Sequence, residues 1–265
     1  MSDLPPPVVL MEDQGPVRVV TINRPKAYNA LNRNVLRELR SAIVDAPGAG
    51  ARAIVLTGAG TKAFCAGADL KELAGLGPDD AYAVLADGQA TLRAIERSTV
   101  PVIAAVNGLA LGGGFELVLA STFSVFADHA TVGLPEAGLG LMPGYGGTQR
   151  LPRLIGRAAA AHVMVTGARI DAARAFAWGL TPVEPVAGDP CAVALHLARE
   201  VATKGPQAVR AILTALDMGA GAAIDAGLAV ETGLAAVATS GPEGAEGIAA
   251  FLAKRAPAFA AGGDG

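Results

Sequence analysis

Two glutamates, Glu116 and Glu136, have the sequence surroundings best suited to acid/base chemistry. Glu116 is the only charged residue between positions 98 and 127 and is followed by Leu-Val-Leu-Ala. A buried carboxylate is costly and has a raised pKa unless it is paired, so such a residue needs a partner or a task. Glu136 follows in Gly-Leu-Pro-Glu-Ala-Gly, where proline and glycine favour a fixed turn. Two carboxylates in one pocket can move protons.

Three glycine-rich stretches, at 64–69, 111–116 and 142–148, lie beside predicted strands. Glycine lets backbone N–H groups approach a ligand, and these donors carry partial positive charge at a helix N-terminus. Ala66-Gly67-Ala68 and Gly113-Gly114 each lie where a strand passes into a helix, so their amides could form an oxyanion hole beside a thioester carbonyl. From spacing alone, two alternatives remain open: the glycine stretches could be tight turns only, and the glutamates could be ion-paired with Arg150 or Arg153.

Composition excludes several other classes of protein. The net charge of −3 provides no general attraction to nucleic acid or to anionic lipid. Cys65 and Cys191 lack CxxC spacing and the histidines form no HxxxH pair, so no disulfide framework and no metal site is expected. Neither a Walker A loop nor a GxGxxG follows a strand. Cys65 lies in a glycine-rich stretch, but no histidine is near it in sequence, so a thiol nucleophile is disfavoured.

The N-terminus and the long apolar run bear on location. The first residues place an acid before any base and contain three consecutive prolines, which suits neither a signal peptide nor a transit peptide. Pro101 and Gly112–Gly114 interrupt the apolar run at 98–127, which predicts buried strand, loop and helix rather than a membrane span. The sequence therefore predicts a cytoplasmic protein without membrane or nucleic-acid partners.

Alternating β-branched and helical segments predict an α/β fold. Strands are expected at 17–22, 53–58, 102–107 and 123–127, and helices at 32–45 and 79–97. A helix capped by Asp171 should stop at Gly179, followed by a short edge strand at 180–186. Strand signals vanish afterwards, and alanine-rich helices are expected at 206–217, 221–238 and 243–254. We therefore predict an α/β core over 1–195 and a helical region over 196–265.

Several motifs, in the same order along the chain, resemble the crotonase (enoyl-CoA hydratase/isomerase) family. They are KAFCAGADLKEL at 62–73, AVNGLALGGGFEL at 105–117, LPE at 134–136 and MPGYGGTQRLPR at 142–153, with further likeness at 23–31 and 251–259. The resemblance implies a spiral of strand-strand-helix units and a C-terminal helical region that joins trimers, often paired as hexamers. It covers nearly the whole chain.

The resemblance also implies a reaction, the addition of water to a trans-2-enoyl-CoA to give a 3-hydroxyacyl-CoA. Glu116 would deprotonate water and Glu136 would protonate the α-carbon, while the amides matching Ala66 and Gly113 form the oxyanion hole. No cofactor is implied, because coenzyme A is part of the substrate. It would bind along the segments comprising Lys26, Ala27, Tyr28, Ala66, Gly67, Ala68, Asp69 and Leu70.

Some positions depart from the family pattern and leave the acyl group undetermined. Tyr28, Leu134 and Tyr145 stand where relatives often carry Leu, Gln and Ala, and Ser121-Thr122 replaces Cys-Asp. A dehydratase of the carnitinyl-CoA type or an enoyl-CoA isomerase is therefore an alternative. An RNA-binding role would need a lysine-rich helix, which the sequence lacks. Asp69 is expected to cap a helix rather than to act as an acid.

Overall fold

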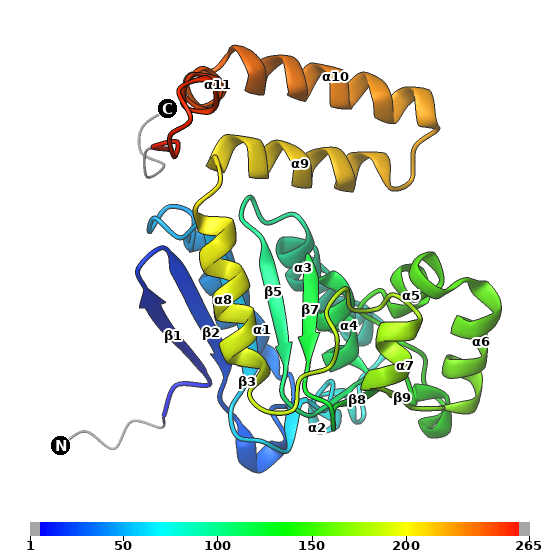
Figure 1. The fold of residues 1–265 in the computed structure, drawn as a ribbon. Coiled ribbons are helices and arrows are strands. Elements are labelled where there is room, and N and C mark those ends of the chain that lie inside the picture. The colour runs from blue at the N-terminus through cyan, green and yellow to red at the C-terminus, as the bar shows by residue number, and fades with distance from the viewer. Residues whose placement is uncertain (1–5, 260–265) are drawn as a thin grey trace.

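The computed structural model, described here for residues 6–259, contains two β-sheets (Figure 1). The larger sheet has the order β1-β2-β3-β5-β7 and is parallel except for the antiparallel edge strand β1. The smaller sheet has the order β4-β6-β8-β9, in which only the β8–β9 pair is antiparallel. The strands are β1 Val9–Gln14, β2 Val17–Ile22, β3 Ala53–Gly58, β4 Ala63–Cys65, β5 Val102–Val106, β6 Leu109–Leu111, β7 Phe123–Phe126, β8 Thr131–Gly133 and β9 Ile170–Asp171.

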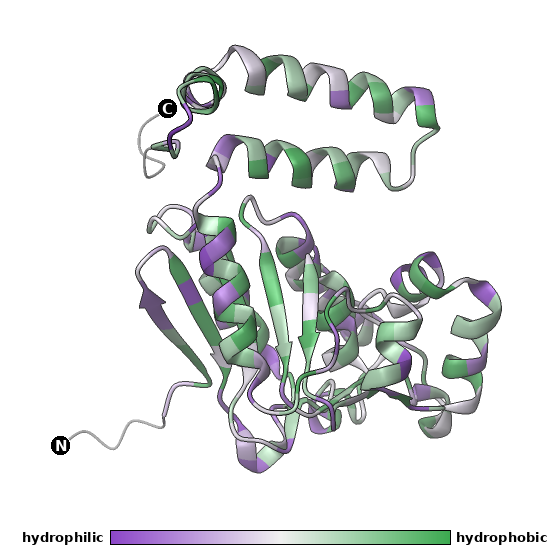
Figure 2. Cartoon of the chain, viewed as in Figure 1, coloured by the Kyte–Doolittle hydropathy of each residue, from purple (hydrophilic) through white to green (hydrophobic). Residues whose placement is uncertain are grey.

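Helices cover both faces of the larger sheet because its central strands are apolar on both sides. Ala53 and Val55 of β3 pack in a cluster with α8, while Ile54 and Leu56 face the main core. Figure 2 shows these strands as strongly hydrophobic. The core helices are α1 Arg33–Asp45, α2 Leu70–Leu73, α3 Pro78–Glu96, α4 Gly113–Ala120, α5 Gly147–Ile155, α6 Arg157–Thr166, α7 Ala172–Ala177 and α8 Pro190–Ala202, with 3₁₀ turns η1 Pro25–Ala27 and η2 Glu136–Leu139.

The expected apolar stripe of the first helix is confirmed. Val35, Leu36, Leu39 and Ile43 are all buried in α1, and the side chain of Asn32 caps the helix by accepting from Val35 N–H. Within residues 6–259, no helix combines the length and apolarity needed to cross a membrane.

The prediction of an edge strand at 180–186 is wrong. The segment is irregular, with a bend at Pro182 and Val183, and it pairs through one isolated bridge between Ala127 and Val186. Pro182 and Pro185 lack the N–H groups that a ladder needs. The hydroxyl of Thr181 donates instead to the carbonyl of Ser124, so a side chain fastens the segment to β7.

The C-terminal helices α9 Pro206–Gly219, α10 Ile224–Ser240 and α11 Pro242–Leu252 lie beyond one end of the larger sheet (Figure 1). The boundary expected at 195/196 falls inside α8, whose Ala194 and Ala198 are fully buried against the sheet. The structure therefore places the transition to the outlying helices just before Pro206. The pattern of small residues in α8 resembled that of the later helices, although α8 belongs to the core.

Candidate active site

Three adjacent parallel strands bring the predicted site residues to one edge of the smaller sheet. Strand β6 pairs with β4 through Cys65 and Ala110, and with β8 through Leu111 and Gly133. Since the carboxyl ends of parallel strands meet at one edge, the loops after β4, β6 and β8 emerge side by side. They carry, respectively, residues 66–68, residues 112–114 and Glu136.

The first two loops touch through their glycines. Gly67 has φ of +103°, and a Cβ built on it would lie 3.4 Å from Gly113 N and 2.9 Å from the carbonyl oxygen of Leu111. A side chain at Gly67 would therefore be both strained and crowded. Gly113 is the first residue of α4, so its N–H has no partner within the helix.

The amide of Ala66 is not available for an oxyanion, contrary to expectation. Its N–H donates to the carbonyl of Tyr28 at 3.0 Å. Ala68 forms a parallel bridge with Leu31, in which the flanking residues Gly67 and Asp69 make the hydrogen bonds. No backbone carbonyl in residues 6–259 accepts from Ala68 N–H, so this amide is free to donate to a ligand. The sequence could not show whether the N–H of Ala66 or that of Ala68 is free.

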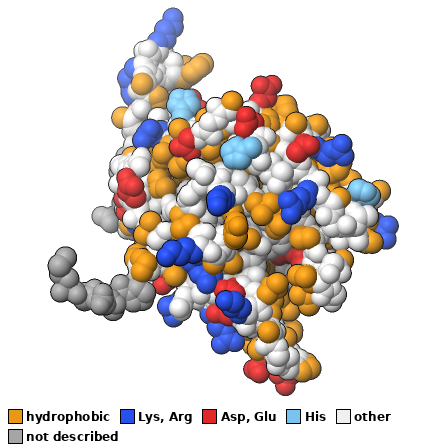
Figure 3. Space-filling view, turned by 90° about the horizontal axis from the view of Figure 1, so that it is seen from below, with side chains coloured by type: hydrophobic (Ala, Val, Ile, Leu, Met, Phe, Trp, Pro, Cys, Tyr) orange, Lys and Arg blue, Asp and Glu red, His pale blue; other side chains and the backbone are white. Residues whose placement is uncertain are grey.

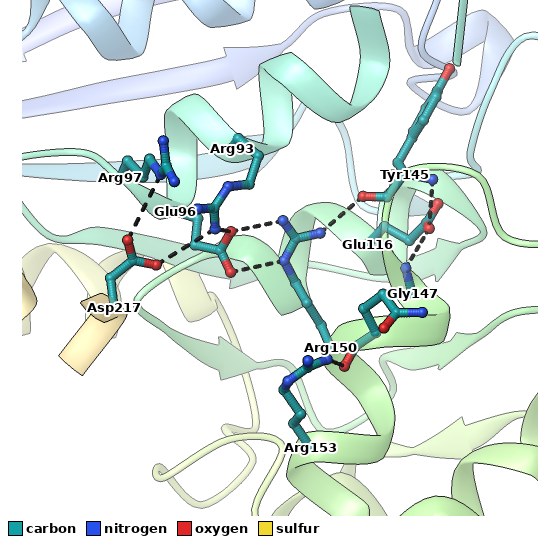
Figure 4. Close-up of polar contacts among 10 residues, drawn as sticks. Arg93, Glu96, Arg97, Glu116, Tyr145, Gly147, Arg150, Arg153 and Asp217 are labelled. Carbon is teal, nitrogen blue, oxygen red and sulfur yellow. Dashed lines mark hydrogen bonds and ion pairs between the residues drawn. The ribbon is translucent and has the colours of Figure 1, made fainter. Parts of the chain in front are cut away.

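Glu116 lies one turn into α4 and is 1% exposed. Its Oε1 accepts hydrogen bonds from Tyr145 N–H at 2.8 Å and from Gly147 N–H at 2.7 Å (Figure 4). Burial raises the pKa of this carboxyl to about 7; the nearby Glu136 also raises it, whereas the two backbone hydrogen bonds lower it. These two donors come from the glycine-rich stretch at 142–148, whose role the sequence did not reveal.

Glu136 begins η2, which follows β8 after Leu134 and Pro135, and its side chain is half-buried. Its Oε1 would lie 3.0 Å from a Cβ at Gly112, which places the carboxyl against the loop that precedes α4. Its Oε2 is buried and has no hydrogen-bond partner in the described chain. Burial raises the pKa of Glu136. The two glutamates therefore flank the loop that carries Gly113.

Neither glutamate is ion-paired within residues 6–259. Arg150 pairs with Glu96 instead, and the guanidinium of Arg153 donates to a carbonyl on its own helix. The structural alternative raised by the sequence, in which these arginines neutralise the glutamates, is thus wrong. Cys65 is fully buried, which raises the pKa of its thiol to about 12 and leaves it unreactive.

The segments expected to hold coenzyme A lie together. Besides the Ala66–Tyr28 bond, Leu31 N–H donates to the carbonyl of Gly67, and Arg24 forms an ion pair with Asp69. Asp69 also caps α2, as expected, by accepting from Lys71 N–H. Lys26, Tyr28 and Leu70 are exposed beside this seam, whereas Ala27, Ala66, Ala68 and Asp69 are partly exposed and Gly67 is buried.

No group of three or more His, Cys, Asp or Glu side chains in the described part of the chain could hold a metal ion. On the face shown in Figure 3, basic, acidic and apolar side chains are interspersed.

Comparison with known proteins identifies the family. Residues 12–262 match the family model described as enoyl-CoA hydratase/isomerase. The chain is 38% identical to the crotonyl-CoA hydratase of Syntrophomonas wolfei, covering 95% of this chain and 97% of that protein. It is also 38% identical to the short-chain-enoyl-CoA hydratase of Clostridium acetobutylicum, covering 93% and 95%.

Solved structures agree with these relatives. The crystal structure of the enoyl-CoA hydratase from Bacillus anthracis superposes with a TM-score of 0.90 at 36% identity, covering 96% of this chain and all of that one. This confirms the predicted crotonase-like α/β architecture. The chain belongs to the enoyl-CoA hydratase/isomerase family, which its motifs had indicated.

Proposed function

We propose that this protein is an enoyl-CoA hydratase that adds water reversibly and syn to a trans-2-enoyl-CoA, giving a 3-hydroxyacyl-CoA. The observation that carries the proposal is the convergence of two carboxyls and two free amides at the ends of β4, β6 and β8. Two relatives of similar length are named as hydratases of crotonyl-CoA and of short-chain enoyl-CoA, which supports this substrate class.

The oxyanion hole is formed by the N–H groups of Ala68 and Gly113. Both amides border the contact between the 66–68 and 112–114 loops, and neither donates to a backbone carbonyl in the described chain. Their hydrogen bonds to the thioester oxygen strengthen as negative charge develops there, which stabilises the enolate-like transition state. Ala66 contributes by fastening its loop to Tyr28.

The two glutamates move the protons. Glu116 takes a proton from water as the hydroxyl oxygen bonds to the β-carbon, and Glu136 gives a proton to the α-carbon. The pair carries one proton in total, on Glu136 before the reaction and on Glu116 after it. Transfer of this proton from Glu116 to Glu136 through solvent restores the starting state. Because the two carboxyls interact, their apparent pKa values belong to the pair. The reverse reaction exchanges their roles.

Coenzyme A lies along the seam of residues 26–28 and 66–70. Lys26 is an exposed cation beside this seam, and Tyr28 and Leu70 offer apolar surface. Coenzyme A is part of the substrate here, and the reaction needs no separate cofactor. A cytoplasmic location stays a prediction.

The first test is hydration of crotonyl-CoA, followed by the loss of absorbance of the conjugated thioester. We expect saturable turnover and 3-hydroxybutyryl-CoA as the product. Inactivity on crotonyl-CoA and on longer 2-enoyl-CoA thioesters, combined with turnover of a 3-enoyl-CoA, would replace the hydratase proposal with an isomerase. Turnover of a specialised hydroxyacyl-CoA alone would identify a dehydratase.

We further propose that α9–α11 form the contact between subunits of a homotrimer or hexamer. No residue of α9 or α10 is buried, although both helices are rich in apolar side chains (Figure 2). The exposed apolar residues are Ile212, Leu216, Met218, Ile224, Leu228, Val237, Ile248, Phe251 and Leu252. Light scattering should give the mass of three or six chains, and a monomer at micromolar concentration would contradict the proposal.

A further inference from the structure

The loop that holds Glu116 is itself held by a partly buried ion pair. We propose that Arg150, fastened by Glu96, is a positioning residue that fixes the carbonyl of Tyr145 and thereby aims the Tyr145 and Gly147 amides at Glu116. The inference rests on the proposed function for the task of Glu116, but its geometry is independent of the substrate.

The guanidinium of Arg150 donates hydrogen bonds to two different residues. Nη1 donates to the carbonyl oxygen of Tyr145 at 2.9 Å, while Nε and Nη2 donate to the two carboxylate oxygens of Glu96 at 3.0 and 2.8 Å (Figure 4). The Arg150 side chain is 13% exposed. A bidentate, largely buried pair of this kind fixes the orientation of the guanidinium plane as well as its position.

Gly146 makes this arrangement possible. Its φ is +111°, and a Cβ there would lie 2.2 Å from Nη1 of Arg150. The guanidinium therefore lies directly against the backbone of the turn whose two flanking N–H groups bind Glu116. A shift of this turn changes the Glu116 hydrogen bonds, because Tyr145 supplies its carbonyl to Arg150 and its amide to Glu116.

The charge of Arg150 also acts on Glu116. Burial dominates the raised pKa of Glu116 and Glu136 raises it further, whereas the positive charge of Arg150 lowers it. The other ionisable groups near the turn are Tyr145, whose pKa is raised to about 12 by burial, and the buried thiol of Cys65, so both are neutral. Glu96, on α3, offsets part of the Arg150 charge.

Beyond Glu96 the ion pairs continue toward the C-terminal helices. Arg93 contacts both Glu96 and Asp217 of α9, and Arg97 lies 3.8 Å from Asp217 (Figure 4). These outer side chains are more exposed than Arg150, so each contributes little by itself. The inner pair of Arg150 and Glu96 is therefore the one that must be tested.

The experiment compares Arg150→Gln, Arg150→Lys and Glu96→Gln with the matched control Arg153→Gln, which removes the same charge one turn along α5. The ionisation of Glu116 is followed without substrate by infrared difference spectroscopy against Glu116→Gln. Arg150→Gln should raise the Glu116 midpoint by about 0.5 to 1 pH unit, because an attractive charge is lost. Glu96→Gln should lower kcat, because Arg150 loses the carboxylate that fixes its guanidinium.

Kinetic measurements separate the positioning role of Arg150 from the effect of its charge. Arg150→Gln should lower kcat about 10- to 100-fold with KM changed less than about threefold, since displaced catalytic groups lose rate rather than affinity. Arg150→Lys should keep the midpoint near that of the wild type yet lose about tenfold in kcat, because lysine cannot bind Glu96 and Tyr145 in the same fork. Arg153→Gln should match the wild type in both.

Two results would overturn the inference. If Arg150→Gln lowers the melting temperature but leaves the midpoint and kcat equal to those of Arg153→Gln, the pair only joins α3 to α5. The inference also fails if Glu96→Gln leaves kcat equal to that of Arg153→Gln, because Arg150 would then not depend on Glu96 for its position. If the wild type does not hydrate enoyl-CoA, the proposed function fails, but the infrared midpoints still decide the role of Arg150.

Discussion

Replacing Glu116 or Glu136 by glutamine is expected to lower kcat for hydration of crotonyl-CoA by about two orders of magnitude or more, the scale of a positioned acid or base. Glutamine keeps the shape of either side chain but cannot accept or give the proton. At Glu116 its amide oxygen can still accept from Tyr145 and Gly147, so the fold is preserved. Stopped assays of both variants, with circular dichroism to verify folding, measure the effect.

The Glu116→Gln protein should also be more stable than the wild type above neutral pH. The folded pKa of about 7 exceeds the ordinary value of 4.5, so the folded state binds more protons between these pH values, and ionisation destabilises it as pH rises through this range. The full shift corresponds to roughly 3 kcal/mol, and we expect about 1–3 kcal/mol of added stability at pH 8. Unchanged stability there, or retained activity, would contradict the roles given to Glu116.

Replacing Gly114 by alanine is expected to destabilise the protein by about 3 kcal/mol or more, which lowers the melting temperature by roughly 6–12 °C. A Cβ at Gly114 would lie 2.0 Å from the carbonyl oxygen of Cys65 and 2.7 Å from its carbonyl carbon. These are backbone atoms of β4, so relief requires α4 to move away from the strand. That movement also displaces Gly113 and Glu116.

Gly48→Ala provides the matched control, because Gly48 lies in an exposed turn after α1 without a positive φ, and a Cβ there would make only an ordinary contact, 3.7 Å from the carbonyl oxygen of Asp45. Alanine restricts the unfolded chain more than glycine does, so this variant should be equal to the wild type or up to about 1 kcal/mol more stable. Differential scanning calorimetry compares the two substitutions. A melting temperature of Gly114→Ala within about 1 °C of the wild type would mean that α4 does not pack on β4 as closely as described.

Much of the fold could be predicted because its signals are local. The strands at 17–22 and 53–58 and the stripe of α1 follow from β-branched runs and from helical periodicity. The strand prediction at 180–186 was wrong because the apolar residues suggested a strand, whereas the two prolines lack the N–H groups that pair with a neighbouring strand. The predicted boundary at 195/196 was misplaced because composition does not specify what a helix packs against, and the alanines of α8 pack on the larger sheet.

The candidate site could be predicted in outline but not in its donors. The isolation of Glu116 in an apolar run indicated a buried carboxyl, and its exposure of 1% in the structure agrees. The choice between Ala66 and Ala68 depends on the direction in which each N–H points, and this is set by pairing with residues 28–31 far away in sequence. Arg150 was considered only as a direct partner of the glutamates, whereas it acts on the backbone that contacts one of them.

The short smaller sheet has a consequence for how binding and folding are linked. Its strands β4, β6 and β8 contain three residues each and are joined by few pairs, with an irregularity between Ala63 and Cys65. A ligand that spans the three loops at their ends binds only when the strands are in register. A bound ligand therefore fixes the register of the smaller sheet. At saturating concentration, its binding free energy adds to the free energy needed to open this sheet locally.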